Sequence, residues 1–183
     1  NLESFATIGG DRSTPGEKGT SVLLPLRPPN YEPQVLIAGG DFPGTQQTSE
    51  WIDLSVAAPA WTPLANLNSP RAQQVNTVLL PDGRVFLAGG IDGADGGPVE
   101  IFDPRNPDAG WELCATMSTP RGYHSAAILL VDGSVLMGGD KPGQWKSGET
   151  TQHERYYPSY VTLARPVITG APASSAYGAV LVV

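Results

Sequence analysis

The chain has 183 residues, of which 40% are hydrophobic, and a formal net charge of −7. Its 11 basic residues are scattered, whereas nucleic-acid partners call for a clustered basic footprint, so we expect no nucleic-acid partner. The longest apolar run, Ala126 to Val131, is far below the roughly 20 residues that cross a bilayer, so we expect no membrane span. The 22 glycines and 18 prolines favour short strands joined by tight turns and predict an all-β chain.

Several landmarks recur at a spacing of 50 residues and indicate an internal repeat. They are a glycine, an aspartate, a tryptophan and an arginine, found as Gly40/Gly90, Asp53/Asp103, Trp61/Trp111 and Arg71/Arg121. A third copy begins at Tyr123. A period of this length is typical of stacked or radially arranged units of supersecondary structure.

In chain order, the first copy predicts strands over Thr20–Leu26 and Gln34–Ala38, joined by a proline-containing loop. The second copy predicts four strands, over Asn76–Leu80, Arg84–Ala88, Pro98–Phe102 and Trp111–Leu113. The third copy predicts strands over Ala126–Val131 and Ser134–Met137, and another from Glu154. In the last two copies the first two strands meet at an Asp-Gly pair, which is a strong hairpin signal.

A four-stranded unit at this period predicts a β-propeller blade, because a small twisted sheet cannot bury both of its faces alone. The sequence lacks the helical periodicity of most solenoids. We therefore expect propeller blades over residues 1–164, divided at about 18–69, 70–119 and 120–164.

These residues resemble a known family. The double glycines, the aromatic-aspartate pairs and the tryptophans resemble the kelch pattern, and Arg121–Gly139 with Tyr157–Val161 resembles the last blade of the galactose oxidase and glyoxal oxidase family. Thr20–Leu26 is similar to an earlier blade of the glyoxal oxidase branch. Residues 165–172 resemble the opening of the immunoglobulin-like domain that follows the propeller, so the resemblance implies that 165–183 is a truncated start of that β-sandwich.

The pair Tyr123-His124 breaks the repeat, because Gln73-Gln74 stands at the same place in the second copy. A phenol oxygen and an imidazole nitrogen suit Cu(II), which favours tetragonal N,O coordination. Adjacent strand residues point to opposite faces, so a shared metal requires a local twist, which Gly122 would permit. Taken alone, the pair also suits a packed aromatic beside a hydrogen-bonded histidine.

The resemblance assigns roles to this pair. Tyr123 would be a copper ligand and the catalytic base that takes the substrate proton, and His124 a second copper ligand. It also implies a Cys-Tyr radical cofactor outside this chain. Trp145, on a loop of the last copy, is a candidate substrate contact.

Other conspicuous residues have structural interpretations. Cys114 is interpreted as a small buried hydrophobe and His153 as a surface side chain. We interpret the repeated Arg71 and Arg121, and the repeated Trp61 and Trp111, as contacts between blades.

The resemblance implies an extracellular or cell-surface copper-radical oxidase that oxidises a small alcohol, aldehyde or sugar with O2 and releases H2O2. Three blades cannot close a ring that resembles a seven-bladed one, so we expect other polypeptide to supply the remaining blades and the immunoglobulin-like domain, and this chain alone to be inactive. The alternative is a non-catalytic kelch module that binds a glycan or a protein.

Overall fold

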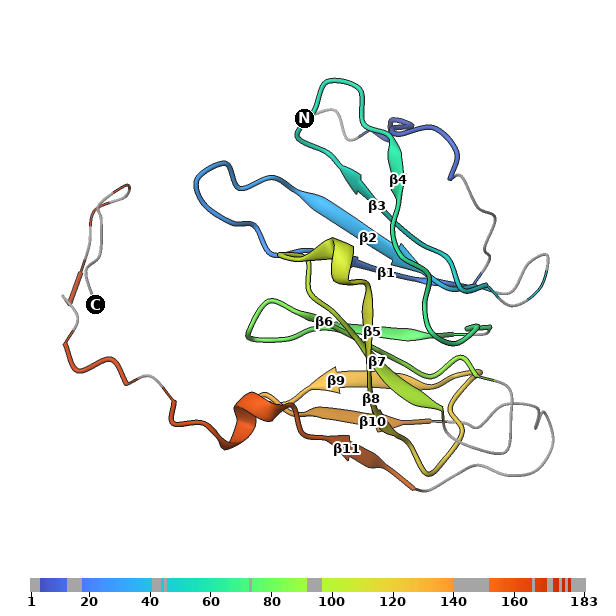
Figure 1. The fold of residues 1–183 in the computed structure, drawn as a ribbon. Helices are drawn as coiled ribbons and strands as arrows, with labels where there is room; N and C mark the ends of the chain where they lie inside the picture. Colours follow the sequence, from blue (N-terminus) through green and yellow to red (C-terminus); the bar gives the residue numbers. More distant parts are fainter. Residues whose placement is uncertain are drawn as a thin grey trace.

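The computed structural model describes residues 4–12, 18–40, 44, 46–72, 74–91, 97–139, 152–165, 167–170, 173–174, 176 and 178. The described strands form three antiparallel sheets (Figure 1). Sheet I has the order β1 (Thr20–Leu23), β2 (Gln34–Ala38), β3 (Ser49–Asp53), β4 (Trp61–Pro63). Sheet II has the order β5 (Asn76–Leu79), β6 (Val85–Ala88), β7 (Pro98–Phe102), β8 (Trp111–Thr116). Sheet III has the order β9 (Ala126–Leu129), β10 (Val135–Gly138), β11 (Glu154–Tyr156).

The Asp-Gly pairs make the predicted hairpin turns. In sheet II, Leu80 N–H donates to the carbonyl of Arg84 at 2.8 Å, and Gly83 adopts a φ of 83°. Gly133 has a φ of 87° in the matching turn of sheet III. A positive φ is costly for residues with a Cβ, so glycine suits this position in both turns.

The sheets stack face to face, with β5 lying between β1 and β9 (Figure 1). Alternation along β6 sends Val85 and Leu87 into a core shared with sheet I, whereas Phe86 and Ala88 enter a core shared with sheet III. Every residue of β6 is buried, because both faces of sheet II are covered. The all-β, partial-propeller architecture predicted from the sequence is confirmed.

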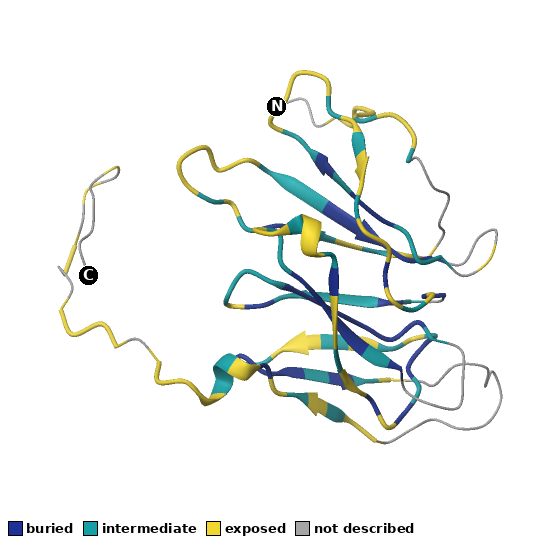
Figure 2. Ribbon diagram, in the orientation of Figure 1, coloured by how far each residue is buried: buried dark blue, intermediate teal, exposed yellow. Residues whose placement is uncertain are grey.

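Sheet III differs from the other two sheets. Within the part of the chain that the structure describes, no fourth strand pairs with β11, and the chain instead forms a 3-10 turn, η2 (Ser159–Thr162). Among the described residues, the expected four strands are therefore found in sheets I and II but not in sheet III. The outward face of sheet III is exposed, with Ile128 at 59% on β9 (Figure 2).

The outward face of sheet I is partly covered. Gly9 lies against the side chain of Ile52 so closely that a Cβ would overlap it, and Ile52 is buried. The outward face of sheet III is thus open, whereas the segment 4–12 shields part of sheet I.

The structure does not test the prediction that residues 165–183 begin an immunoglobulin-like domain. The described residues after η2 contain no strand, and the expected strand over residues 179–183 lies outside the described residues. Among the described residues, no helix is long and apolar enough to cross a membrane.

Candidate functional site

A left-handed residue precedes the first strand of each sheet. Lys18, Gln74 and His124 have φ values of 58°, 54° and 61°, and each lies two residues before β1, β5 or β9. This conformation costs roughly 1–2 kcal/mol for a residue with a Cβ. The three residues share no side-chain chemistry, so the sequence does not reveal this repeated feature.

Hydrogen bonds join the three turns into one rim. Gln74 N–H donates to the carbonyl of Lys18 at 3.3 Å, and the side-chain oxygen of Gln74 accepts a short hydrogen bond from His124 N–H. The hydroxyl of Ser125 donates to the carbonyl of Gln74 at 3.3 Å and accepts from the amide of Asn76 at 2.9 Å. The starts of β1, β5 and β9 therefore present their side chains at one end of the stacked sheets.

Tyr123 and His124 lie side by side in this rim. Their ring centroids are 3.7 Å apart with an angle of 33° between the ring planes, His124 is exposed, and Tyr123 is half-buried. The turn is closed by Ser125 N–H donating to the carbonyl of Gly122 at 2.9 Å. The two rings therefore pack against each other at an exposed turn.

The expected local twist is present, but Gly122 does not provide it. Gly122 is not among the residues with positive φ, whereas His124 itself takes the left-handed conformation. Gly139 packs directly on the His124 carbonyl, with no room for a Cβ. The turn is thus held from both sides, by Gln74 and by Gly139.

The described residues do not complete a metal site. They contain no group of three or more His, Cys, Asp or Glu side chains that could hold a metal ion. His153 is exposed just before β11, with its ring against Gly138, as expected of a surface side chain. Cys114 is half-buried on β8 beside the core of sheets II and III. Trp145 lies outside the described residues.

The repeated arginines join neighbouring sheets, as the sequence predicts. Arg71 N–H donates to the carbonyl of Gln46 at 2.9 Å, whereas its buried guanidinium donates to the carbonyls of Gly89 (3.0 Å) and Pro98 (2.8 Å) in sheet II. Burial lowers the pKa of the Arg71 guanidinium, and Glu100, 2.6 Å away, raises it. Main chain and side chain of one residue thus hold two sheets together.

Sequence reasoning missed the carboxylates that accompany these arginines. Glu100 accepts from Asn68 N–H at 2.6 Å, and Glu154 accepts from Ser118 N–H at 2.7 Å. Each of these glutamates therefore holds, by a hydrogen bond, the loop that precedes the first strand of its own sheet. In sheet I the matching glutamate is Glu50, whose Oε1 lies 3.7 Å from Nε of Arg12. The sequence signal for these carboxylates is the recurrence of a glutamate in the third strand of every copy.

Trp111 is packed between sheets as predicted. It is buried against Phe102, at 5.1 Å between ring centroids, and its indole N–H donates to the hydroxyl of Ser49 in sheet I at 3.1 Å. Trp61, at the same place in sheet I, is only half-buried. Trp111 is therefore more deeply buried than Trp61.

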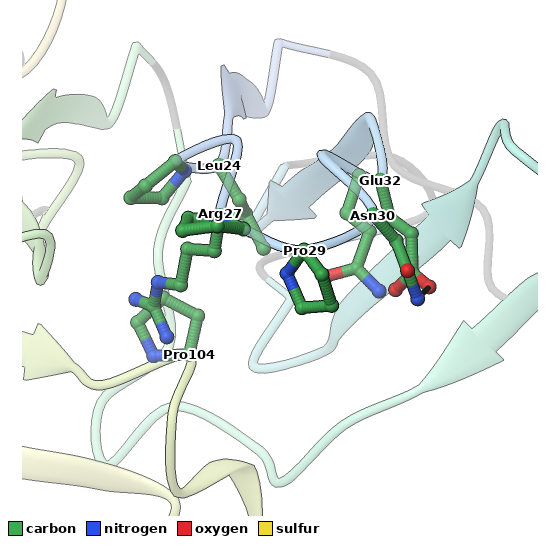
Figure 3. A pocket seen from close by; sticks show the side chains of 9 residues that line it. Leu24, Arg27, Pro29, Asn30, Glu32 and Pro104 are labelled. Atoms are coloured by element: carbon green, nitrogen blue, oxygen red, sulfur yellow. Dashed lines mark hydrogen bonds between the residues drawn. The ribbon is translucent and has the colours of Figure 1, made fainter. Parts of the chain in front are cut away.

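A surface pocket of about 160 Å³ lies beyond the end of β1, whereas the rim lies before its start. Figure 3 shows the side chains that line this pocket. The β1–β2 loop forms most of it, with Pro29 between Arg27 and the pair Asn30 and Glu32, and Pro104 approaches from the end of β7. The amide of Asn30 donates to Glu32 at 3.0 Å. This pocket does not include Tyr123 or His124, and its prolines carry no acid-base or metal chemistry.

No family model matches the chain, and no curated protein matches it significantly. A solved structure described as a novel fungal alcohol oxidase with catalytic diversity among the AA5 family, in complex with copper, is similar over 89% of this chain at a TM-score of 0.69 and 22% identity. Another, described as the structure of YjhT, is similar over 73% of this chain at a TM-score of 0.56 and 17% identity. This chain covers 37% and 36% of the two structures, a little over a third of their length. These likenesses show the fold.

Proposed function

We propose that this chain is part of a copper-dependent oxidase of primary alcohols or aldehydes, in which Tyr123 and His124 supply two copper ligands. The observation that carries the proposal is the pair of rings 3.7 Å apart at an exposed turn of the rim. One phenol and one imidazole match the N,O donors that Cu(II) prefers. The likeness to a fungal copper alcohol oxidase over 89% of the chain supports it.

The residues present fit part of a copper site. A tetragonal ion needs more donors than two, and the described residues offer no cluster that would add them. The remaining ligands, the Cys-Tyr cofactor and the other blades belong to polypeptide outside the described residues. Bound copper would supply one-electron chemistry with O2.

The contribution of this chain is positioning and proton transfer. Gln74 and Gly139 fix the His124 turn, which directs the imidazole to the side of Tyr123. As a phenolate, Tyr123 would accept the hydroxyl proton of the substrate and become a neutral phenol. The alcohol loses one hydrogen from oxygen and one from carbon to become the aldehyde, and O2 is reduced to H2O2. An extracellular location is part of the same proposal.

The second candidate is a non-catalytic module that binds a glycan or protein. The absence of a cluster of three metal-binding side chains among the described residues favours it. In this case the rim would serve as a binding surface, and Tyr123 and His124 would be a packing pair.

Copper titration of the full-length protein separates the two candidates, with peroxide release as a second measurement. We expect His124→Ala to weaken copper binding by at least about tenfold and to abolish peroxide release, because a missing ligand cannot be replaced by water at equal affinity. His153→Ala is the matched control and should leave both unchanged, since His153 is exposed and precedes β11, at the edge of sheet III opposite to β9, where His124 lies. Unchanged copper affinity and peroxide release in His124→Ala would refute the oxidase role of this pair.

A further inference from the structure

Lys18 occupies in sheet I the place that His124 occupies in sheet III. Each lies two residues before the first strand of its sheet, takes the left-handed conformation and is exposed. Gln74 holds the same place in sheet II, between them, but its side chain is engaged with the His124 backbone. The rim therefore carries an exposed ammonium and an exposed imidazole at equivalent positions of two sheets.

The backbone at Lys18 is held in place on both sides. Its carbonyl accepts from Gln74 N–H at 3.3 Å. The next residue, Gly19, packs on the end of β2 so closely that there is no room for a Cβ. The hydroxyls of Thr20 and Thr77, 2.7 Å apart, then join β1 to β5. The Lys18 side chain thus leaves the rim from a fixed point.

The hydrogen bonds of the rim limit the separation of Lys18 and His124. Standard bond lengths, followed through Gln74, place the Cα atoms of Lys18 and His124 at most about 16 Å apart. An extended lysine side chain carries its ammonium about 6 Å from Cα, so the ammonium can reach to within about 10 Å of the His124 Cα. A small molecule with functional groups at both ends can span what remains between the ammonium and the imidazole.

The two repeated arginines near the strand starts do not offer a cation to a ligand. Arg71 and Arg121 lie three residues before Gln74 and His124, but their side chains are 0% exposed and donate to backbone carbonyls. Lys18 differs, because its residue is exposed. A lysine ammonium has three donors on a flexible stem and forms charge-assisted hydrogen bonds with carboxylates and phosphates.

We propose that the substrate is a small alcohol or aldehyde that carries a carboxylate, and that Lys18 pairs with this carboxylate while the reacting end lies at Tyr123 and His124. The inference rests on the proposed oxidase function and names its substrate class. The carboxylate is remote from the reacting carbon, so its ion pair forms equally in the ground state and the transition state. Such uniform binding lowers KM and leaves kcat unchanged.

The test compares 3-hydroxypropanoate with its neutral amide, 3-hydroxypropanamide, on the full-length, copper-loaded protein, with peroxide release as the measurement. We expect Lys18→Met to lower the carboxylate-to-amide ratio of kcat/KM by at least about tenfold, through a higher KM for the carboxylate, because it loses a charge-assisted hydrogen bond. Lys18→Arg keeps the charge and should keep this ratio within about threefold of the parent value.

Arg165→Met is the matched control for loss of a positive charge. Arg165 is exposed after η2 and lies in a cleft with Gly133, in the β9–β10 turn, at the end of β9 remote from the rim. This variant should have the carboxylate-to-amide ratio of the parent protein.

A binding measurement separates this inference from the oxidase proposal. Saturation-transfer NMR follows 3-hydroxypropanoate on the copper-free protein without turnover, and we expect Lys18→Met to weaken its binding by at least about tenfold. Turnover of both substrates with an unchanged ratio in Lys18→Met, or undiminished binding by this variant, would overturn the inference. Lys18-dependent binding without peroxide release from either substrate would instead refute the oxidase function and retain Lys18 as the carboxylate site.

Discussion

Neutralising the repeated glutamate should cost far more stability in sheet II than in sheet III. Arg71 and Glu100 are both 0% exposed and 2.6 Å apart. In sheet III the matching atoms of Arg121 and Glu154 are 3.9 Å apart, and the Glu154 side chain is 24% exposed. Removing one charge from a fully buried pair costs about 3–5 kcal/mol, whereas an exposed pair contributes about 0–1 kcal/mol. The pair in sheet III lies between these limits, because Arg121 is 0% exposed but its contact with Glu154 is long and Glu154 is partly solvated.

We therefore expect Glu100→Gln to lower the free energy of unfolding by about 3 kcal/mol, at the lower end because the amide oxygen can still accept from Arg71. Glu154→Gln should cost about 1 kcal/mol. Urea denaturation followed by circular dichroism measures both values. Glu112→Gln, on an exposed position of β8, is the control and should change stability by less than about 0.5 kcal/mol. A cost for Glu154→Gln equal to or above that of Glu100→Gln would refute the reasoning.

The remaining predictions concern tryptophan packing and acid stability. Trp111→Phe should lower the free energy of unfolding by about 2 kcal/mol, because it loses the hydrogen bond to Ser49 and buried contacts. Trp61→Phe should lower it by less than about 1 kcal/mol, because Trp61 is only half-buried. Urea denaturation compares the two variants, and equal losses of stability would contradict the packing difference. Hydrogen bonds from Ser134 lower the pKa of Asp132, so its ionised form stabilises the fold above the ordinary pKa near 3.8, and this contribution is lost as the pH falls through the lowered value. The melting temperature of Asp132→Asn should accordingly fall less between about pH 5 and pH 2 than that of the parent chain, and parallel curves would count against this.

The sequence predicted the hairpins well because their determinants are local. In sheets II and III, Gly83 and Gly133 occupy turn positions that favour glycine, and the apolar runs on either side supply the paired strands. β7 begins and ends where the sequence predicts. β8 runs to Thr116, three residues beyond the prediction, because a register shift between Pro98 and Glu100 lets it continue along β7. Pairing of this kind depends on the partner strand and leaves no local signal.

The candidate site was only partly predictable for a similar reason. Tyr123-His124 stood out because it broke the repeat, and the structure brings the two rings together. The left-handed residues at Lys18, Gln74 and His124 could not be found, since glycine, the usual marker of positive φ, is absent from all three. The side chain of Gln74, which fixes the His124 turn, likewise carries no sequence signature.

Backbone strain by itself does not identify the functional residue in this rim. Strained conformations gather at active sites, but here the same conformation recurs in all three sheets. What differs is the use of each side chain: Gln74 is engaged with the His124 backbone, whereas the His124 imidazole is exposed beside a phenol. The repeat therefore supplies the geometry in every sheet, and the exception in side-chain chemistry is the reason for which we propose His124, and not Gln74, as a metal ligand.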